Sequence, residues 1–271
     1  MGHNRPQWAA VHRSTMEPRG GLDTRALIQP CTMQWLMRRT LKYLTVKRIA
    51  SHVIPCMLGV TRNYLLHVLR IGVCEDMTVI TLKYGNTNTF YIQGCEGGLL
   101  FDTDYAGTLP LFYKALKQNN IRVKDIGYVL ASHYHPDHMG LVGELVKQGV
   151  KLLLIDIQKE FVHFSDNIFA RDKLRYTPVD DTDATMISCK ESRSFLSSIG
   201  IHGEIIHTPS HSEDSISLIM DNGDCLVGDL EPSEYIGAYE ENSALKADWE
   251  LIASFHPEIV FYAHRPEHRI H

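Results

Sequence analysis

The chain has 271 residues, of which 44% are hydrophobic and 22% charged, so it is long enough to bury a substantial core in one or two domains. Its net charge of −5 argues against a general nucleic-acid coat, and six cysteines without a CxxC pair exclude a disulfide scaffold. We expect reduced thiols and a cytoplasmic protein, because the first residues lack the apolar core of a cleavable signal and no stretch reaches the roughly 18 apolar residues of a membrane span.

The charge is divided unevenly along the chain. Residues 1–76 hold eleven Lys and Arg against four Asp and Glu, whereas residues 77–271 hold sixteen against twenty-eight. The basic segment has three interpretations: an amphipathic helix in weak contact with anionic lipid or nucleic acid, a solvated helix without a partner, or an extension outside the folded domain. We favour the last, because a clean strand pattern begins at Met77. The predicted domains are therefore a basic N-terminal extension, 1–76, and a folded domain, 77–271, which carries no strong nucleic-acid signal.

Regular elements follow one another from Met77. Three short alternating segments with Gly and Asn between them, 77–85, 87–94 and 99–104, predict an antiparallel meander. Apolar residues at helical spacing predict a helix at 109–120, and an apolar strand at 126–133 runs into a polar turn. Further helices are predicted at 139–149, 158–164, 191–200 and 242–255, and further strands at 151–156, 203–209, 215–221, 224–229 and 257–264.

The turn after the strand at 126–133 is crowded with side chains that bind metals. Residues His133, His135, Asp137 and His138 fall within six positions. Alternation along a strand puts His133 and His135 on one side, where they can share an ion, and Asp137 and His138 beyond Pro136 can hold a second. Each buried polar group needs its own hydrogen-bond partner, so burying these four side chains for a purely structural purpose would cost folding free energy. The turn therefore predicts a metal site, for which zinc is a suitable ion.

This turn also resembles a known signature. SHYHPDH is similar to the H-x-H-x-D-H motif of the metallo-β-lactamase superfamily, and four further segments resemble family motifs in the same order: LLFDTD with Asp102, HTPSHSEDSI with His211, LVGDL with Asp229 and FYAH with His264. The resemblance covers about residues 77–264. It implies an α/β fold, a four-layered αβ/βα sandwich in which two mixed β-sheets are flanked by helices, with two metal ions at the edge between the sheets.

The resemblance also implies which residues hold metal. The implied ligands form two groups joined by one bridge: His133, His135 and His211 for the first ion, Asp137, His138 and His264 for the second, and Asp229 between them. Asp102 and Ser132 would lie behind the ligands and steady the ligand loop. One position departs from the family pattern, since Ser210 stands where the family usually has Gly.

A hydrolase is the function that the resemblance implies. Two metal ions, expected to be zinc with iron or manganese as alternatives, would hold a bridging hydroxide, and Asp137 would act as the catalytic residue that orients it or carries its proton. A bridging aspartate is the family pattern of thioesterases, lactonases and phosphodiesterases, so we expect a small-molecule ester, thioester, lactone or phosphodiester as substrate. Two alternatives stay open: an iron-dependent redox enzyme or oxygenase of the same fold, and a non-catalytic metal-binding sensor.

Residues 164–187 are polar and lack periodicity, which predicts an irregular loop over the site. Within it, Lys173, Arg175 and Tyr176 are candidate substrate contacts that would recognise an anionic group. The alternative is an exposed loop whose charges are solvated. The sequence predicts neither the oligomeric state nor the identity of the substrate.

Overall fold

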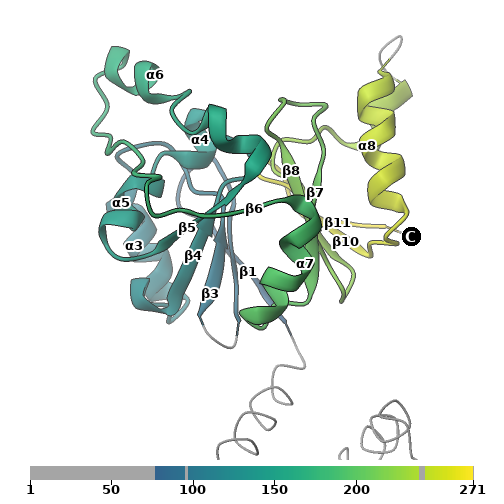
Figure 1. Cartoon of the computed structure of the whole chain (residues 1–271), viewed down its shortest axis with the longest axis horizontal. Coiled ribbons are helices and arrows are strands. Elements are labelled where there is room, and N and C mark those ends of the chain that lie inside the picture. Colours follow the sequence, from purple (N-terminus) through teal and green to yellow (C-terminus); the bar gives the residue numbers. More distant parts are fainter. Residues whose placement is uncertain (1–76, 95–96, 238–241, 271) are drawn as a thin grey trace, which may run out of the picture. The chain divides into compact units, whose positions relative to one another are not determined.

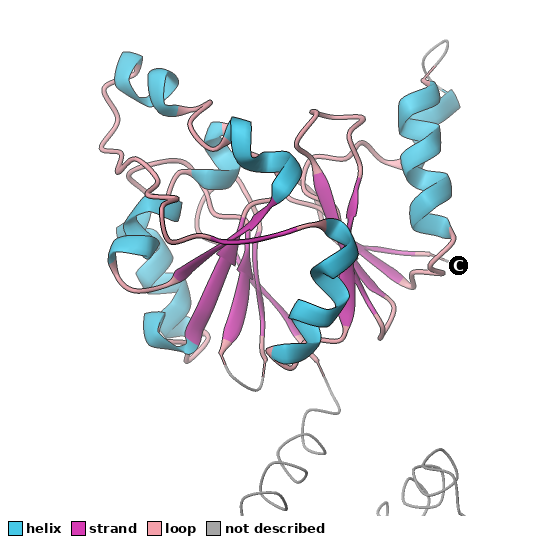
Figure 2. Ribbon diagram, viewed as in Figure 1, coloured by secondary structure: helices cyan, strands magenta, loops and turns pink. Residues whose placement is uncertain are grey.

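The computed structural model describes residues 77–94, 97–237 and 242–270, so the predicted basic extension, 1–76, lies outside the described residues. Two sheets lie side by side in this folded part, with helices on their outer sides (Figure 1). The secondary structure is mapped onto the same view in Figure 2.

The first sheet contains six strands in chain order: β1 (Val79–Leu82), β2 (Thr89–Ile92), β3 (Gly98–Phe101), β4 (Ile126–Leu130), β5 (Lys151–Ile155) and β6 (Thr185–Ile187). The first three pair antiparallel, with Tyr91 lying between Ile80 and Leu100, which confirms the predicted meander. From β3 to β6 the pairing is parallel. The carboxyl ends of these strands therefore share one edge of the sheet.

The second sheet has the order β11-β10-β9-β8-β7. Its strands are β7 (Gly203–His207), β8 (Ile216–Met220), β9 (Asp224–Leu226), β10 (Ile259–Phe261) and β11 (His268–Arg269). Strands β9 and β10 are parallel, and the other neighbours are antiparallel. Both sheets are therefore mixed. The two-residue strand β11 was not predicted, because it is too short to show a period.

The helices connect the strands and cover the sheets. They are α3 (Leu109–Gln118), α4 (Pro136–Met139), α5 (Val142–Lys147), α6 (Asp166–Arg171), α7 (Cys189–Ser198) and α8 (Ser243–Ala253), with 3₁₀ turns η3 (Val123–Asp125), η4 (Asp156–Phe161) and η5 (Ser233–Gly237). Helix α3 starts with a proline in its first turn and buries Phe112, Ala115 and Leu116, the apolar stripe that the sequence predicts.

Three predicted segments differ in detail from the structure. The helix predicted at 139–149 is shorter in the structure, where α5 spans Val142–Lys147 and Met139 ends α4. The helix predicted at 158–164 overlaps the 3₁₀ turn η4, which ends at Phe161. The segment 164–187 is not irregular throughout, since it contains α6 and β6. Helix α6 buries Phe169 alone among its six residues, so it leaves no periodic pattern in the sequence.

Three hydrophobic clusters lie in series across the two sheets. Leu100 of β3 packs in one cluster with Phe112 of α3, whereas its neighbour Phe101 packs with Phe261 of β10 in a second cluster between the sheets. The third cluster lies between the second sheet and α8 and includes Trp249. Successive strand residues point to opposite faces, so a strand that is covered on both sides is apolar at every position. These clusters define four layers and confirm the predicted sandwich.

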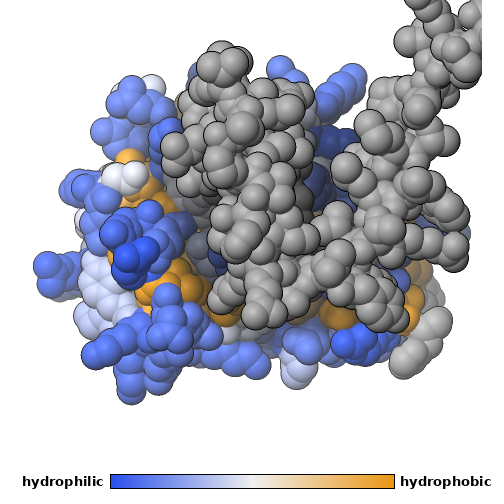
Figure 3. All heavy atoms as spheres, turned by 90° about the horizontal axis from the view of Figure 1, so that it is seen from below, coloured by the Kyte–Doolittle hydropathy of each residue, from blue (hydrophilic) through white to orange (hydrophobic). Residues whose placement is uncertain are grey.

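The described helices are all too short or too polar to cross a membrane. The surface of the described residues visible in Figure 3 is mostly hydrophilic, with apolar residues between the polar ones.

Candidate metal centre

The seven predicted ligands come together at the edge where parallel strands of both sheets end. They follow β4 (His133 and His135), lie in α4 (Asp137 and His138), sit in the β7–β8 loop (His211), or follow β9 and β10 (Asp229 and His264). Strand β4 ends at Leu130, so His133 and His135 occupy a loop beyond it rather than the strand itself. The carboxyl ends of strands in α/β sheets are the usual place for a site.

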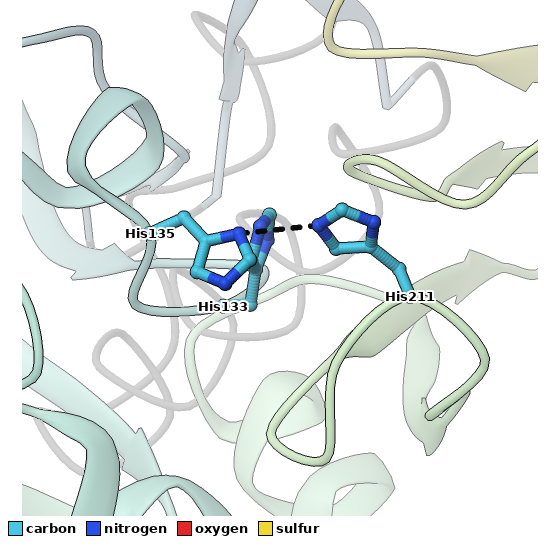
Figure 4. A group of neighbouring side chains, drawn as sticks. All are labelled: His133, His135 and His211. Carbon is cyan, nitrogen blue, oxygen red and sulfur yellow. Dashed lines mark hydrogen bonds between the residues drawn. The ribbon is translucent and has the colours of Figure 1, made fainter.

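The first group consists of His133, His135 and His211, whose candidate ligand atoms lie within 4.8 Å of one another. The ring of His133 lies 4.5 Å from that of His135 and 4.7 Å from that of His211, measured between centroids. The Nε2 atom of His211 is 3.2 Å from Nδ1 of His135. The three rings are turned toward one another (Figure 4), which is the arrangement of side chains that share one ion.

The second group consists of Asp137, His138, Asp229 and His264, again within 4.8 Å. Asp229 Oδ1 lies 3.2 Å from His138 Nε2 and 3.1 Å from His264 Nε2. Its other oxygen, Oδ2, lies 3.7 Å from Nε2 of His211 in the first group. The carboxylate of Asp229 therefore faces both groups, which is the position predicted for the bridge.

Three histidines use Nδ1 for hydrogen bonds, which leaves Nε2 to face a cation. His138 donates from Nδ1 to Asp102 Oδ2 over 3.0 Å, and His264 donates from Nδ1 to the carbonyl oxygen of Asn86 over 3.1 Å. His133 Nδ1 lies 3.0 Å from Oγ of Ser132, whose own proton is donated to Asp102, so this Nδ1 is the donor. With Nδ1 donating, Nε2 is the nitrogen of each ring that is left to ligate a metal, once any proton that it carries has been released.

Unsatisfied buried atoms supply an independent test of whether these residues fit a metal. His133 Nε2, His138 Nε2 and Asp229 Oδ1 are buried and have no hydrogen-bond partner among the described residues. Asp229 Oδ1 is close to two imidazoles, yet neither contact has hydrogen-bond geometry, so these atoms converge on a common point rather than on each other. A buried polar atom without a partner is destabilising by about 1–3 kcal/mol. One or two cations at that point would satisfy all three, so the residues fit the predicted metal.

Asp102 and Ser132 contact two of the candidate ligands, His138 and His133, from the side of Nδ1. Asp102 accepts hydrogen bonds from the backbone N of Ser132 (2.6 Å), from Ser132 Oγ (2.9 Å) and from His138 Nδ1. Its backbone has a φ of 61°, a left-handed conformation that Asp and Asn adopt more readily than most residues. Gly228 also has a positive φ, and a Cβ there would lie 2.3 Å from Ser132 Oγ, which explains the glycine before Asp229.

The pKa values of the histidines differ between the two groups. Burial, and then the charges of neighbouring imidazoles, hold the pKa of His133 well below its ordinary value, and burial also lowers the pKa of His211. Although burial opposes it, the carboxylates of Asp102 and Asp229 raise the pKa of His138 to about 10. The carboxylates of Asp137 and Asp229 raise the pKa of His264 to about 11. These values describe the protein without a cation.

The pKa values of the two carboxylates in the second group are lowered. Burial alone would raise the pKa of Asp229, but the adjacent His138 and His264 hold it well below its usual range. The pKa of Asp137 is lowered in the same way by His264 and His138. Both carboxylates are therefore ionised at neutral pH and available to a cation.

The three candidate substrate contacts lie after the end of α6. Lys173 and Arg175 are exposed. The ring of Tyr176 stacks on Phe169 with centroids 4.2 Å apart, and its hydroxyl donates to Asp166 Oδ1 over 2.8 Å. Tyr176 therefore packs α6 against the first hydrophobic cluster, whatever else it contacts.

An aromatic residue beside the ligands was not predicted. Phe164 is 55% exposed, and its ring centroid lies 5.8 Å from that of His135. Its only sequence signal is its place at the start of the polar segment 164–187. Asn86 was also missed, because it acts through a backbone carbonyl that any residue type would supply.

The four-layered sandwich carries these histidines and aspartates at the edge that its two sheets share. A model of the Metallo-beta-lactamase superfamily matches residues 82–264, more than half of the chain. The chain belongs to the metallo-β-lactamase superfamily, as the sequence motifs predict.

Individual relatives agree with this assignment. The chain is 26% identical over 216 residues to the Beta-lactamase-like protein 2 homolog of Drosophila melanogaster, covering 78% of this chain and 67% of the relative. It is 27% identical over 139 residues to the Probable metallo-hydrolase MJ0888 of Methanocaldococcus jannaschii, covering 51% of this chain and 65% of the relative. The matches thus span about two thirds of each relative's length.

Solved structures share the fold. The metallo-beta-lactamase family protein TTHA1429 from Thermus thermophilus is similar with a TM-score of 0.53 at 17% identity, covering 71% of this chain and 73% of that one. TTHA1623, solved in a di-iron-bound form, is similar with a TM-score of 0.53 at 20% identity, covering 71% and 94%. At these identities the likeness concerns the fold alone.

Proposed function

We propose that this protein is a dinuclear metal-dependent hydrolase, with zinc as the metal and a small ester, thioester, lactone or phosphodiester as the substrate. The observation that carries the proposal is the convergence of buried atoms without hydrogen-bond partners, His133 Nε2, His138 Nε2 and Asp229 Oδ1, at the centre of seven ligating side chains. The relative described as a probable metallo-hydrolase supports the same reaction class.

The residues of the proposed site would have different roles in the reaction. Two divalent cations bound there would make hydroxide available from water at neutral pH and polarise the oxygen of the scissile bond. Asp137 lies beside the second group, with Oδ2 3.1 Å from His264 Nε2, and its lowered pKa keeps it ionised. An ionised carboxylate in this position can orient the attacking water and accept its proton. Asp102 and Ser132 hold His138 and His133 in the orientation that presents Nε2.

The substrate proposal gains one detail from Phe164. An exposed aromatic ring next to His135 offers an apolar contact at the edge of the site. A substrate with an apolar group next to its scissile bond would bury part of that ring. Lys173 and Arg175 stay as proposed contacts for an anionic group.

A second proposal keeps the same site and changes the metal. Five imidazoles and two carboxylates suit iron as well as zinc. The similar structure TTHA1623 is described in a di-iron-bound form. An iron-dependent redox or oxygenase activity is therefore the alternative proposal, and it predicts oxygen consumption where the hydrolase predicts none.

Turnover by the reconstituted enzyme tests the proposed function. The purified protein is stripped with a chelator, reloaded with zinc or with iron, and assayed against lactone, thioester, phosphodiester and β-lactam substrates. The hydrolase proposal predicts turnover that zinc restores and that His133→Ala abolishes. His202→Ala, an exposed histidine outside the ligand groups, is the matched control and should keep the wild-type rate. Oxygen consumption by the iron form without hydrolysis by the zinc form would transfer the assignment to the redox alternative.

A further inference from the structure

Two buried polar side chains, Asp214 and Gln158, join the loops that carry the first ligand group. Asp214 is 2% exposed and Gln158 is 0% exposed. Asp214 lies in the segment HTPSHSEDSI, three residues after His211, but it is not among the predicted ligands, and Gln158 lies outside the family motifs. We propose that Asp214 and Gln158 are positioning residues that hold His133, His135 and His211 in register for the first metal ion, an inference that rests on the proposed metal site.

Asp214 reaches the neighbours of all three ligands. Its Oδ2 accepts a hydrogen bond from the backbone N of Tyr134, the residue between His133 and His135, over 2.7 Å. Its Oδ1 accepts a hydrogen bond from Oγ of Ser212, the residue after His211, over 2.8 Å. One carboxylate thus links the β4–α4 loop to the β7–β8 loop. Both oxygens of the buried carboxylate are thus engaged, one by each loop, which suits a rigid link.

Gln158 reinforces the same link from η4. Its Nε2 lies 3.0 Å from the carbonyl oxygen of Ala131, 3.3 Å from that of Ser132 and 3.2 Å from that of Asp214. Its Oε1 accepts a hydrogen bond from the backbone N of Ile155. The amide therefore binds carbonyl groups of both ligand loops and anchors them to the end of β5. The carbonyl of Ser132 also accepts from the backbone N of Ile216, so loss of the Gln158 amide would be felt mainly by the carbonyls of Ala131 and Asp214.

The second ligand group has other supports. His138 is held by Asp102 and His264 by the carbonyl of Asn86. Within the described residues, the hydrogen bonds of Asp214 and Gln158 do not reach Asp137, His138, Asp229 or His264. The proposed role is therefore selective: loss of either side chain should disturb the first ion and spare the second.

The experiment measures the binding of two ions to metal-free protein. Stripped full-length protein is titrated with Co²⁺, and the visible absorption bands and the two dissociation constants are recorded for the wild type, Asp214→Ala, Asp214→Asn and Gln158→Met. His133→Ala identifies which bands belong to the first ion. Asp104→Ala is the matched control, since Asp104 is an equally buried carboxylate that accepts from the backbone N atoms of Asn86 and Tyr105.

Changes that remove support from metal ligands typically weaken binding by about 10–100-fold. We expect Asp214→Ala and Gln158→Met to raise the dissociation constant of the first ion by this factor and to shift its absorption bands. The dissociation constant of the second ion should stay within about twofold of the wild-type value. Asp214→Asn keeps an oxygen acceptor for the backbone N of Tyr134, so its affinity for the first ion should be close to that of the wild type. This variant also provides a measurement if the alanine variant does not fold. Asp104→Ala should leave the first ion unchanged.

Equal weakening of both ions, or the same loss of the first ion in Asp104→Ala, would mean that the effect is general destabilisation and would overturn the inference. Wild-type binding constants in both Asp214→Ala and Gln158→Met would overturn it as well, while leaving the proposed function intact. Failure of the wild type to bind Co²⁺ at all would instead overturn the proposed metal site, and the inference with it.

Discussion

The two ligand groups share an edge of the fold but differ in charge. The first group is made of imidazoles alone, and the pKa values of His133 and His211 are lowered, so both are neutral at pH 7. The second group contains two carboxylates, which raise the pKa of His138 to about 10 and that of His264 to about 11. The first group can therefore accept a cation without releasing protons from these two rings, whereas the second must release them. Similar geometry thus predicts two sites with different binding behaviour.

The largest expected effect is the loss of both ions in Asp229→Ala, since this carboxylate faces both groups. Substitution of a residue that supports a metal ligand lowers metal affinity by about 10–100-fold. We therefore expect loss of the ligand itself to lower the affinity for each ion by more than about 100-fold. Elemental analysis after dialysis measures the metal that remains. A variant that loses one ion and keeps the other at wild-type occupancy would show that Asp229 belongs to a single group.

His133→Ala should separate the two groups. The variant removes one of three imidazoles from the first group and none from the second, so we expect loss of the first ion, retention of the second, and turnover reduced by more than about 100-fold. Metal content and the steady-state rate are measured on the same preparation. Full occupancy together with a wild-type rate would contradict the assigned ligands.

The pH dependence of binding should differ between the groups. At pH 7 both His138 and His264 are protonated in the metal-free protein, so binding of the second ion releases up to about two protons and its affinity rises up to about 100-fold per pH unit. The first ion should show a weaker dependence above pH 7. Calorimetric titration in buffers of different ionisation enthalpy counts the protons. Release of the same number of protons on binding of the first and of the second ion would contradict the expected difference between the two groups.

The same shifts predict how the stability of the metal-free protein depends on pH. A histidine whose folded pKa is raised stabilises the fold fully below its ordinary pKa of 6.5, and this contribution is lost as the pH rises through the folded pKa. The metal-free protein should therefore lose stability between about pH 7 and pH 10, and the metal-loaded protein should lose less. Thermal unfolding of both forms across this range measures the difference, and parallel curves would argue against it.

Asp102→Asn is expected to weaken the second ion more than the first. The change keeps a side chain that tolerates the positive φ at this position but removes the charge that His138 Nδ1 contacts. We expect the second ion to bind about 10-fold more weakly. Co²⁺ titration resolves the two steps. An effect confined to the first ion would show that Asp102 acts mainly through Ser132 and His133.

The smallest expected effect is that of Phe164→Ala. This ring lies beside His135 without ligating, so the variant should keep its metal and its kcat. We expect KM for a substrate with an apolar group to rise about fivefold, equivalent to about 1 kcal/mol of lost binding. Comparing substrates with and without that group measures the effect. A fall in kcat with unchanged KM would place Phe164 in the chemical step instead.

The sequence predicted the parts of this structure that depend on residue type and period. Strands covered on both faces are apolar at successive positions, as in Leu99-Leu100-Phe101, and a dense cluster such as His133 to His138 has few explanations besides metal. Short elements were missed, because α6 buries a single residue and β11 has only two. The ligand set itself stays a prediction until a metal is measured.

Contacts between distant loops could not be predicted either. Gln158 and Asp214 are 56 residues apart, and nothing in their composition shows that their loops meet. Asn86 supports His264 across 178 residues through a carbonyl group that leaves no mark in the sequence. The strength of these supports depends on tertiary packing rather than on local residue type.

The seven side chains are proposed to form a site for two metal ions, and the metal content of the protein is the first quantity to measure. The full-length protein is expressed in medium supplied with both zinc and iron, purified without chelators, and analysed for elements per folded chain. We expect close to two ions per chain, and zinc for the proposed hydrolase. Folded wild-type protein without bound metal, even after incubation with either ion, would contradict the proposed metal site.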